Sequence, residues 1–361
     1  RHVKIGIIGA GQLGRMLALS GYPLGVEFLF LDPSPDAPGG HVGPILHGGF
    51  DDAAKLNELA ARVDLITFDV ENVPVDAIRE IAKTTPFLPQ PDALGTSQDR
   101  LAEKTLFRSL KIPTPEFQAV DSLADLVTAV DRVGLPGILK TRRLGYDGRG
   151  QFRLRSARDI EAAWAALGAV PLIYEAFVDF SREVSVIGVR STSGEIRVYP
   201  LAANTHEDGI LRHSIAPYRN AGLQKQAETY LKRVFRRFDY AGILTIEFFV
   251  RQGRLVANEM APRVHNSGHW TIEGAATSQF ENHIRAILGL PLGSTEAIGH
   301  SGMVNFIGTM PAVEAVLSIP GAHFHGYGKA PRPNRKIGHC TVTASSPAAR
   351  DKALGKVLKA I

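Results

Sequence analysis

A glycine-rich turn near the N-terminus is the feature that most narrows the folds open to this chain. The apolar residues 3–8 run directly into Gly9-Ala-Gly-Gln-Leu-Gly14, and a helical pattern follows through Leu19. A second apolar run, residues 27–31, ends at Asp32. Strand, glycine turn, helix and a second strand with a terminal acid match the dinucleotide-binding fingerprint. The pattern predicts a parallel sheet with helices on its faces.

Helical and strand patterns continue to alternate over residues 51–62, 65–69 and 75–83, which predicts a small doubly wound domain. Asp32 is followed at once by Pro33, an unusual continuation for a ribose-binding acid, so the glycine turn fits another phosphate ligand as well as NAD. Glu71 comes just after the strand at 65–69, at the edge where such sheets bind ligands. Glu71 is therefore a candidate ligand contact, with a polar cap before the next helix as the alternative.

Bulk properties exclude several classes of protein. The chain has 361 residues, too many for one ordinary core, which predicts two or three domains. No apolar run approaches the length of a membrane span, so no membrane association is expected. The formal charge is +5 and the basic residues are spread out, which argues against nucleic-acid binding and suits an anionic small substrate. Cys340 is the single cysteine, which excludes an internal disulfide and favours a cytoplasmic setting.

Two carboxylates, Glu247 and Glu259, flank a hairpin signal at Gln252-Gly253. A two-residue turn there would place Glu247 opposite Asn258. One extra residue in the connection would place Glu247 opposite Glu259 instead. In either register both carboxylates reach one hard cation, which suits Mg²⁺ bound to the phosphates of a nucleotide. A surface hairpin with two unrelated glutamates is the alternative.

A second glycine-rich segment follows the predicted strand at residues 137–140. Gly145, Gly148 and Gly150 lie close together, with cations on both sides. Such a loop can fold over phosphates, and Lys140 at the end of the strand favours that interpretation over a simple hairpin tip. The segment is not a P-loop, because no Gly-Lys-Ser/Thr follows.

Three polar residues in the middle of the chain are candidate nucleotide contacts. Glu175 lies within the apolar strand at 172–178, which requires a polar partner for it. The backbone there could pair with an adenine, and Glu183 could take ribose hydroxyls or form a salt bridge with Arg182. His206 falls in a predicted loop at residues 204–209, where it either contacts a ligand or is solvated.

The C-terminal part of the chain is predicted to be rich in strands, at residues 302–307, 322–325 and 338–344. Between the last two strands lie Lys329, Arg332, Arg335 and Lys336. Prolines restrict the shape of this cationic segment, which makes it a candidate anion receptor. A solvated turn is the alternative.

Taken together, these motifs resemble those of the ATP-grasp superfamily. The resemblance is carried by Gly9-Ala-Gly-Gln-Leu-Gly-Arg-Met16, Glu71-Asn-Val-Pro74, Gly145-Tyr-Asp-Gly-Arg-Gly-Gln151, Arg182-Glu-Val-Ser185, Asn258-Glu-Met-Ala-Pro-Arg-Val-His-Asn-Ser-Gly-His269 and Gln279-Phe-Glu-Asn-His283. Within the superfamily, the run that ends at His269 is similar to the 5-(carboxyamino)imidazole ribonucleotide synthase family of purine biosynthesis. Asp69 departs from that family's pattern, in which a glutamate is expected.

The resemblance implies a mixed α/β and α+β chain of three domains. Residues 1–99 would form an N-terminal doubly wound parallel sheet, the pre-ATP-grasp domain, which contributes to the substrate site. Residues 100–293 would form the ATP-grasp domain, which holds ATP between two sheets. Residues 294–361 would form a small strand-rich C-terminal domain. A homodimer is also implied.

The implied activity is that of an ATP-dependent carbon–nitrogen ligase. Bicarbonate, activated by ATP as carboxyphosphate, would carboxylate 5-aminoimidazole ribonucleotide, giving the N-carboxylated ribonucleotide, ADP and phosphate. The implied ATP contacts are Arg100, Lys140, Gly145, Tyr146, Asp147, Gly148, Arg149, Gly150, Gln151, Glu175, Ala176, Phe177, Val178, Glu183, His206, Asn258 and Glu259. Mg²⁺ would be held by Glu247 and Glu259.

Two further groups of residues complete the expected site. The candidate catalytic residues are Tyr146, Arg263, His265 and Asn266, because the last three closely follow the metal ligand Glu259 and Tyr146 lies in the closing loop. The candidate contacts to the ribonucleotide are Gln12, Glu71, Arg263, His265, Lys329, Arg335 and Lys336.

Other functions explain less of the sequence. A formate-using or biotin carboxylase-like ATP-grasp ligase would share the hairpin carboxylates but not the Asn-Ser-Gly-His continuation. An NAD-dependent dehydrogenase would leave Glu247, Glu259 and the second glycine loop without a role. A catalytically silent nucleotide-binding module is disfavoured because every position needed for chemistry is filled.

Overall fold

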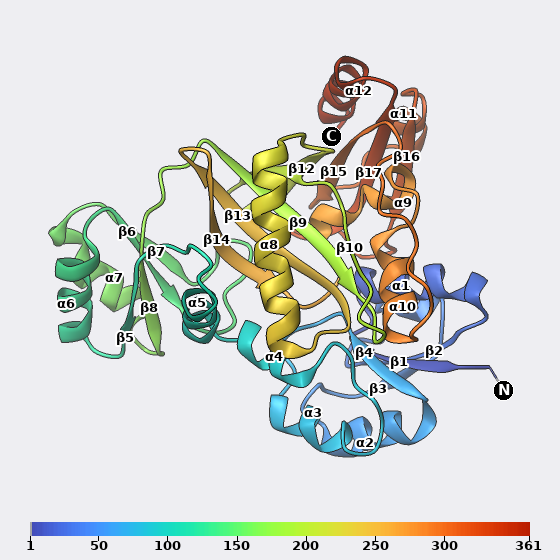
Figure 1. The fold of residues 1–361 in the computed structure, drawn as a ribbon, viewed down its shortest axis with the longest axis horizontal. Coiled ribbons are helices and arrows are strands. Elements are labelled where there is room, and N and C mark those ends of the chain that lie inside the picture. The colour runs from blue at the N-terminus through green and yellow to red at the C-terminus, as the bar shows by residue number, and fades with distance from the viewer. Residues whose placement is uncertain (1) are drawn as a thin grey trace.

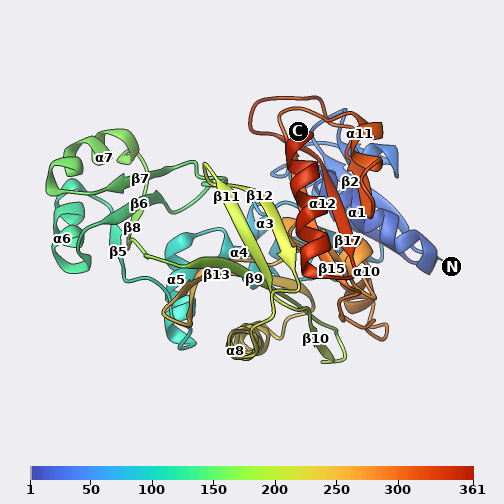
Figure 2. The same cartoon turned by 90° about the horizontal axis from the view of Figure 1, so that it is seen from above.

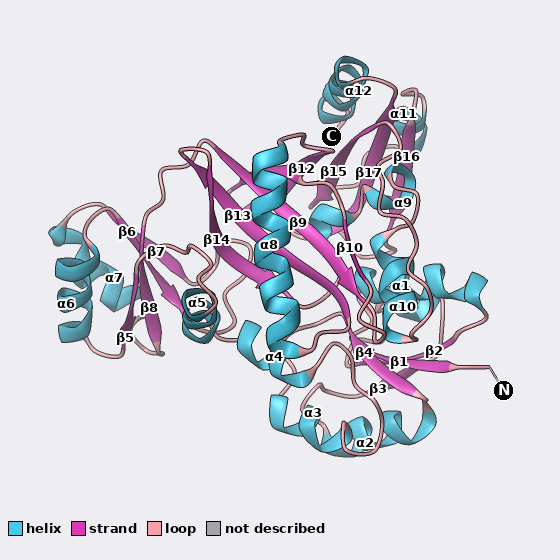
Figure 3. Cartoon of the chain, viewed as in Figure 1, coloured by secondary structure: helices cyan, strands magenta, loops and turns pink. Residues whose placement is uncertain are grey.

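Three β-sheets organise residues 2–361, the part of the chain that the computed structural model describes (Figure 1). One sheet belongs to the N-terminal part, one is small and peripheral, and one runs through the centre of the molecule (Figure 3). Within the described residues, no helix has both the length and the apolar character that a membrane crossing requires.

The N-terminal sheet is parallel, with strand order β3-β2-β1-β4. Its strands are β1 (Lys4–Ile8), β2 (Glu27–Asp32), β3 (Ile45–His47) and β4 (Leu65–Phe68). Its helices and 3₁₀ turns are α1 (Gln12–Gly21), η1 (Tyr22–Leu24), η2 (Pro38–His41), α2 (Ala53–Arg62) and α3 (Val75–Ile81). Successive side chains of β1 point to opposite faces, so Ile7 joins the core that includes Leu17 of α1, whereas Ile8 joins the core that includes Leu59 of α2. The predicted doubly wound sheet is confirmed.

The glycine turn between β1 and α1 encloses two carboxylates of the protein itself. Ala10 N donates to Asp32 Oδ2 at 2.8 Å, and Gly14 N donates to Asp69 Oδ2 at 2.9 Å. Gly9 has φ +93°, and a Cβ there would lie 1.7 Å from Asp69 Oδ1. Asp32 and Asp69 thus occupy backbone donors that a dinucleotide phosphate would need, so the structure disfavours the NAD interpretation.

The small sheet is antiparallel, with strand order β5-β8-β6-β7. Its strands are β5 (Phe117–Val120), β6 (Gly137–Thr141), β7 (Gln151–Leu154) and β8 (Leu172–Ala176). It is covered by α6 (Leu123–Val133), the 3₁₀ turn η3 (Ala157–Asp159) and α7 (Ile160–Leu167), at the left of Figure 1. Two helices, α4 (Pro91–Ser97) and α5 (Arg100–Ser109), connect it to the N-terminal part.

The central sheet has nine strands, with the order β14-β13-β9-β11-β12-β15-β17-β16 and β10 paired with β9. The strands before the C-terminal part are β9 (Arg182–Arg190), β10 (Ile196–Val198), β11 (Ala202–Glu207), β12 (Ile210–Ala216), β13 (Gly242–Arg251) and β14 (Arg254–Ala261). The long helix α8 (Ala221–Phe238) lies across one face, where Leu231 and Phe235 share a core with Val186 and Ile246 (Figure 1). The remaining elements here are η4 (Asn266–Gly268), α9 (Thr271–Gly274) and α10 (Gln279–Ile287).

The C-terminal strands extend this sheet rather than forming one of their own. They are β15 (His300–Ile307), β16 (Ala322–Gly326) and β17 (Lys336–Ala344), and β15 pairs with β12. Helices α11 (Val313–Leu317) and α12 (Pro347–Lys359) accompany them, and Figure 2 shows α12 lying along β15 and β17. The predicted strands are confirmed, whereas α12 is an addition that the sequence patterns did not predict.

The predicted loop at residues 204–209 is wrong. These residues form most of β11 and the tip of a hairpin, where Glu207 pairs with Ile210 around Asp208-Gly209. Asp208 and Gly209 both have positive φ, as a two-residue hairpin turn requires. His206 therefore projects from a strand of the central sheet rather than from a loop.

Candidate active site

The hairpin of β13 and β14 brings Glu247 and Glu259 directly opposite each other. Gln252 and Gly253 both have positive φ and form a two-residue turn. Pairing is regular as far as Phe248 and Ala257, after which the register shifts by one residue. The extra residue is Asn258, which forms a bulge within β14. Glu247 therefore faces Glu259, as one of the two expected registers had it, but the extra residue lies in the strand and not in the connection.

The two facing carboxylates are electrostatically unlike. Burial raises the pKa of Glu247, and the neighbouring charge of Glu259 raises it further. Burial acts on Glu259 in the same direction, but a hydrogen bond from Glu247 and the charge of Arg100 lower its pKa. The two carboxyl groups thus share one proton, which lies with Glu247. A cation bound between them would instead stabilise both carboxylates in their charged form.

Arg100 links this pair to the second glycine loop. Its Nη1 lies 3.3 Å from Glu259 Oε2, and its Nη2 donates to Gly145 O at 3.2 Å. Arg100 is the first residue of α5, whose N-cap is Asp99. The predicted residues Arg100, Gly145 and Glu259 are therefore neighbours.

Glu175 is buried in β8 between two lysines. Lys104 Nζ lies 3.1 Å from Glu175 Oε1, and Lys140 forms an ion pair with Oε2. Burial alone would raise the pKa of Glu175, but the charges of Lys104 and Lys140 lower it to about 2. Lys104 also donates to Asn258 O. The polar partner that Glu175 required is thus this pair of lysines.

Lys104 is a residue that sequence reasoning missed. It is 1% exposed and connects α5 with β8 and β14. The available signal was its position four residues after Arg100, which places both side chains on one face of a helix.

Two histidines flank the carboxylate of Glu247. His206 Nε2 lies 3.8 Å from Glu247 Oε1, while its Nδ1 lies 3.1 Å from Glu183 Oε2. His265 Nε2 lies 3.7 Å from Glu247 Oε2, and its Nδ1 accepts from Ser267 N at 3.2 Å. Burial, followed by the charge of Arg263, lowers the pKa of His265 to about 3, so its imidazole is neutral.

The remaining polar residues of this part of the site form two pairs. Arg263 Nε lies 3.1 Å from Glu71 Oε1, which joins the segment after β14 to the N-terminal sheet. Asn266 Nδ2 donates to Asn305 Oδ1 at 2.9 Å, and Asn305 Nδ2 donates back to Asn266 Oδ1 at 2.5 Å. Asn266 therefore uses its amide to hold β15.

The cations of the C-terminal segment contact different parts of the chain. Lys329 Nζ donates to Gln12 Oε1 at 3.0 Å, and Lys336 Nζ lies 3.2 Å from Asp147 Oδ1. Arg335 Nη1 donates to Ala330 O within its own segment. Burial and the charge of Arg335 lower the pKa of Lys329 to about 8.

The second glycine loop carries the other predicted contacts. Tyr146 is 58% exposed, and its hydroxyl accepts from Arg149 Nη1 at 3.1 Å. Gln151 begins β7 and pairs with Lys140. Ala176 ends β8, and Phe177 beyond it lies under the Arg153 guanidinium, 4.0 Å from the ring centre, with Val178 buried next to it.

Known proteins match the chain along its whole length. The ribonucleotide synthetase preATP-grasp domain family matches residues 2–98, the ATP-grasp domain family residues 105–280, and the phosphoribosylaminoimidazole carboxylase C-terminal domain family residues 301–353. N5-carboxyaminoimidazole ribonucleotide synthase of Pseudomonas aeruginosa is 50% identical over 355 residues, which cover 98% of each chain. The chain belongs to the N5-carboxyaminoimidazole ribonucleotide synthase family.

Solved structures of the N5-carboxyaminoimidazole ribonucleotide synthase family agree with this. The enzyme from Thermus thermophilus superimposes with a TM-score of 0.95 at 51% identity, over 99% of this chain and 98% of that chain. The Aspergillus clavatus enzyme, solved in complex with ADP and 5-aminoimidazole ribonucleotide, superimposes with a TM-score of 0.93 at 34% identity, over 99% of this chain and 98% of that chain. The family expected from the sequence motifs is confirmed.

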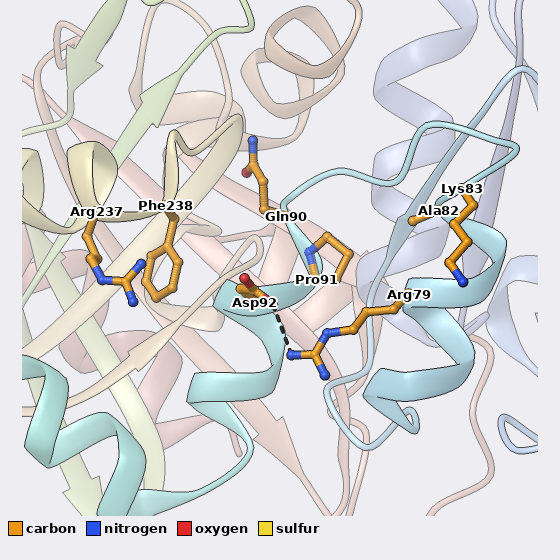
Figure 4. Close-up of a pocket in the computed structure, with 8 residues that line it drawn as sticks. All are labelled: Arg79, Ala82, Lys83, Gln90, Pro91, Asp92, Arg237 and Phe238. Atoms are coloured by element: carbon orange, nitrogen blue, oxygen red, sulfur yellow. Dashed lines mark hydrogen bonds and ion pairs between the residues drawn. The ribbon is translucent and has the colours of Figure 1, made fainter.

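A surface hollow elsewhere on this synthase-family chain shares no residue with the candidate site. It has a volume of about 440 Å³ and lies between α3, α4 and the end of α8 (Figure 4). Arg79 and Asp92 on its wall are joined to each other at 3.0 Å, as the dashed line in Figure 4 marks. The hollow is broad and open, so the site is better defined by the facing carboxylates than by this cavity.

The facing carboxylates of Glu247 and Glu259 suit a Mg²⁺ ion that is also bound by substrate phosphates. Among residues 2–361, no group of three or more His, Cys, Asp or Glu side chains is arranged to enclose a metal alone. Mg²⁺ is usually held by one or two carboxylates together with substrate phosphates. The facing Glu247 and Glu259, with Arg100 and Lys140 nearby, fit that arrangement.

Proposed function

We propose that this chain carboxylates 5-aminoimidazole ribonucleotide with bicarbonate and ATP, in de novo purine biosynthesis. One observation supports the proposal: Glu247 and Glu259 face each other, and the pair has neighbours both in the candidate phosphate-binding region and in the run of residues 258–269. Arg100 connects them to the glycine loop, and His265 connects them to the family-specific run. The phosphate donor and the carboxyl acceptor would therefore meet at one metal-binding pair.

The first step is phosphoryl transfer to bicarbonate. A bicarbonate oxygen attacks the γ-phosphorus of ATP, the bond to the β-phosphate oxygen breaks, and carboxyphosphate and ADP form. Mg²⁺ bound by Glu247 and Glu259 would neutralise the phosphate oxygens. Lys140 and Arg100 add positive charge on the other side of the phosphates, and the loop of residues 144–150 excludes water.

The nucleotide itself would be held where the small and central sheets face each other. The backbone of Ala176, Phe177 and Val178 would contact the adenine, and Glu183 the ribose hydroxyls. His206 would orient Glu183, since its Nδ1 lies 3.1 Å from that carboxylate. The carboxylate of Glu175 would act indirectly, because it fixes Lys140.

In the second step, the amine of the ribonucleotide attacks the carboxyl carbon and phosphate departs. The carbon–nitrogen bond forms as the carbon–oxygen bond of carboxyphosphate breaks, and the amine loses a proton. Arg263 would hold the carboxyl oxygens, oriented by Glu71 at 3.1 Å. Neutral His265 would present Nε2–H, because its Nδ1 accepts from Ser267 N. Asn266 becomes a positioning residue, since Asn305 engages its amide.

The phosphate of the ribonucleotide requires a second anion site. Lys329 supports one between the N-terminal and C-terminal parts, because its ammonium reaches Gln12 beside the glycine turn. Arg335 and Lys336 add charge from the same segment. Tyr146, exposed in the second glycine loop, would contact the ribonucleotide from the opposite side.

Other parts of the proposal concern the organisation of the protein. We assign domains to residues 1–99, 100–293 and 294–361, a homodimeric assembly, and a cytoplasmic location consistent with a single, buried cysteine. In this division the first domain would contain the N-terminal sheet, and the second would contain the small sheet and six strands of the central sheet, which the strands of the third domain continue.

The proposal is tested by measuring ADP release with ATP, bicarbonate and 5-aminoimidazole ribonucleotide, leaving out each in turn. Release should require all three and Mg²⁺. ADP formation that is equally fast without the ribonucleotide, or turnover with formate in place of bicarbonate, would contradict the assignment.

A further inference from the structure

The outer edge of β14 is held by side chains of α5 at the point where the strand bulges. Within residues 2–361, β14 ends the central sheet on one side, so its outer backbone groups face no further strand. There, Lys104 donates to Asn258 O, and Glu103 Oε2 accepts from Met260 N at 3.1 Å. Two side chains of one helix thus take the place of a neighbouring strand.

Three side chains of α5 contact three consecutive residues of β14. The helix lies between the small sheet and β14 (Figure 1), and Arg100, Glu103 and Lys104 share one of its faces because they are three and four positions apart. Arg100 Nη1 lies 3.3 Å from the carboxylate of Glu259, whereas Glu103 and Lys104 bind the backbone on either side of it. The helix therefore fixes both the carboxylate and the strand that carries it.

The bulge decides which side chain faces Glu247. Pairing of β13 with β14 is regular from the turn to Phe248 and Ala257, and Asn258 is then passed over, so that Glu247 pairs with Glu259. A regular ladder would pair Glu247 with Asn258 and turn Glu259 to the opposite face of the sheet, because successive side chains of a strand alternate. The two carboxylates can therefore bind one cation only while the bulge persists.

Glu103 is a buried acid that the proposed mechanism does not use. It is 3% exposed, and within residues 2–361 Met260 N is the one hydrogen-bond partner of its carboxyl. Burying a carboxyl away from water is costly unless a donor receives it. Lys104, by contrast, also pairs with Glu175, so its contact with the bulge is one of two. The effect of α5 on the bulge can therefore be tested separately through Glu103.

We infer that Glu103 is a positioning residue for the metal-binding pair. By accepting from Met260 N it holds the bulge at Asn258, and the bulge keeps Glu259 on the face of the sheet where Glu247 lies. The inference rests on the proposed function, since it concerns how the two carboxylates come to share one cation. Glu103 acts through Glu259 and not on a substrate.

Two substitutions of Glu103 separate the hydrogen bond from the charge. Glu103→Gln keeps a carbonyl oxygen that can accept from Met260 N, whereas Glu103→Leu is of similar size and has no acceptor. We expect Glu103→Leu to lower kcat about 30-fold and to raise the Mg²⁺ concentration for half-maximal rate at least about fivefold. Glu103→Gln should stay within about threefold of the unmodified chain in both quantities. Equal losses in the two variants would overturn the inference, because the charge and not the hydrogen bond would then matter.

Gln226→Leu is the matched control, since it removes an acceptor from the same edge of β14 at a distance from the bulge. Gln226 Oε1 accepts from Leu255 N at 3.0 Å, and Leu255 pairs regularly with Val250. This variant should keep both kcat and the Mg²⁺ requirement within about twofold. A loss equal to that of Glu103→Leu would mean that any missing contact along this edge disturbs the carboxylates, and would overturn the role given to Glu103.

Hydrogen exchange in the protein without nucleotide or metal provides a measurement that does not depend on turnover. Relative to the amides of β9, which report opening of the whole sheet, we expect the Met260 amide to exchange at least about tenfold faster in Glu103→Leu than in the unmodified chain. Its rate should be unchanged in Glu103→Gln and in Gln226→Leu. Equal exchange of Met260 in Glu103→Leu and in the unmodified chain would overturn the inference.

Failure of the proposed function would look different from failure of this inference. The unmodified chain would then release no ADP that depends on the ribonucleotide, whereas the exchange rate of the Met260 amide would still depend on the acceptor at Glu103.

Discussion

Gln279 binds the backbone of His265 with both polar atoms of its side chain. Its Oε1 accepts from His265 N at 3.0 Å, and its Nε2 donates to His265 O at 2.7 Å. Gln279 is fully buried at the start of α10, and Gly268 leaves room for it, since a Cβ there would lie 2.5 Å from Oε1. The position of the His265 imidazole is thus set from behind by a residue that does not reach the reacting groups.

Replacing Gln279 by leucine should therefore impair catalysis through His265. Two partly buried backbone groups would lose their partners, at a cost of about 3 kcal/mol in the free energy of unfolding. The displaced imidazole should lower kcat about 100-fold. The measurements are steady-state kinetics with each substrate varied and unfolding by urea.

Gln224 provides the matched control for this variant. Its Oε1 accepts from Leu201 N at 3.0 Å and its Nε2 donates to Tyr199 O at 3.2 Å, in the same two-sided manner. Gln224→Leu should lose similar stability but keep its kcat. If the two variants lose kcat equally, Gln279 contributes only to folding.

Glu259→Gln should abolish turnover while the fold stays intact. The uncharged amide would weaken the hold on Mg²⁺, so we expect a loss of kcat of about 1,000-fold and a higher Mg²⁺ requirement for ATP binding. A titration of nucleotide binding against Mg²⁺ measures the second effect. The control is Glu116→Gln, which replaces an exposed carboxyl and should change neither kcat nor the Mg²⁺ requirement. Retention of activity by Glu259→Gln would exclude the metal role.

The predicted binding of the ribonucleotide phosphate depends on pH through Lys329. Burial, and then the charge of Arg335, lower the pKa of Lys329 to about 8. The charged form, which binds phosphate, is present below that pH and is lost as the pH rises through it. kcat/KM for the ribonucleotide should therefore fall as the pH rises above about 8.

Lys329→Arg separates this titration from others in the protein. Arginine stays charged in proteins, so the variant should retain kcat/KM for the ribonucleotide at high pH. The profile of kcat/KM for ATP should be alike in both proteins. A ribonucleotide profile that is unchanged in Lys329→Arg would assign the fall to another group.

Local patterns in the sequence are sufficient for much of the fold. The parallel sheet follows from the alternation of strands and helices, and a hairpin at Gln252-Gly253 follows from its turn residues. The pairing of Glu247 with Glu259 stays open at the level of sequence because the bulge at Asn258 is not a property of the turn. Lys104 Nζ donates to Asn258 O in that bulge, across 154 residues of sequence.

The hairpin of β11 and β12 could not be predicted from the sequence for a different reason. Asn204 and Ser214 face the interior, where Asn204 Nδ2 donates to Ser185 Oγ at 3.0 Å and Ser214 Oγ donates to Asn204 Oδ1 at 2.7 Å. These polar residues satisfy one another, so the strands lack the apolar alternation by which strands are recognised. Contacts such as that between Gln12 and Lys329, 317 residues apart, are likewise invisible to local patterns.

Lys104→Met tests whether the unpredicted lysine holds the nucleotide site together. The variant would leave Glu175 with Lys140 alone and Asn258 O without its donor, so we expect a loss of about 3–5 kcal/mol in the free energy of unfolding. Lys225→Met, at an exposed position of α8, should change it by less than about 0.5 kcal/mol. The double variant Lys104→Met with Glu175→Gln should be less destabilised than the sum of the two single variants, because each single variant already breaks the same Lys104–Glu175 ion pair. Additive losses would mean that Lys104 stabilises the protein by packing rather than through Glu175.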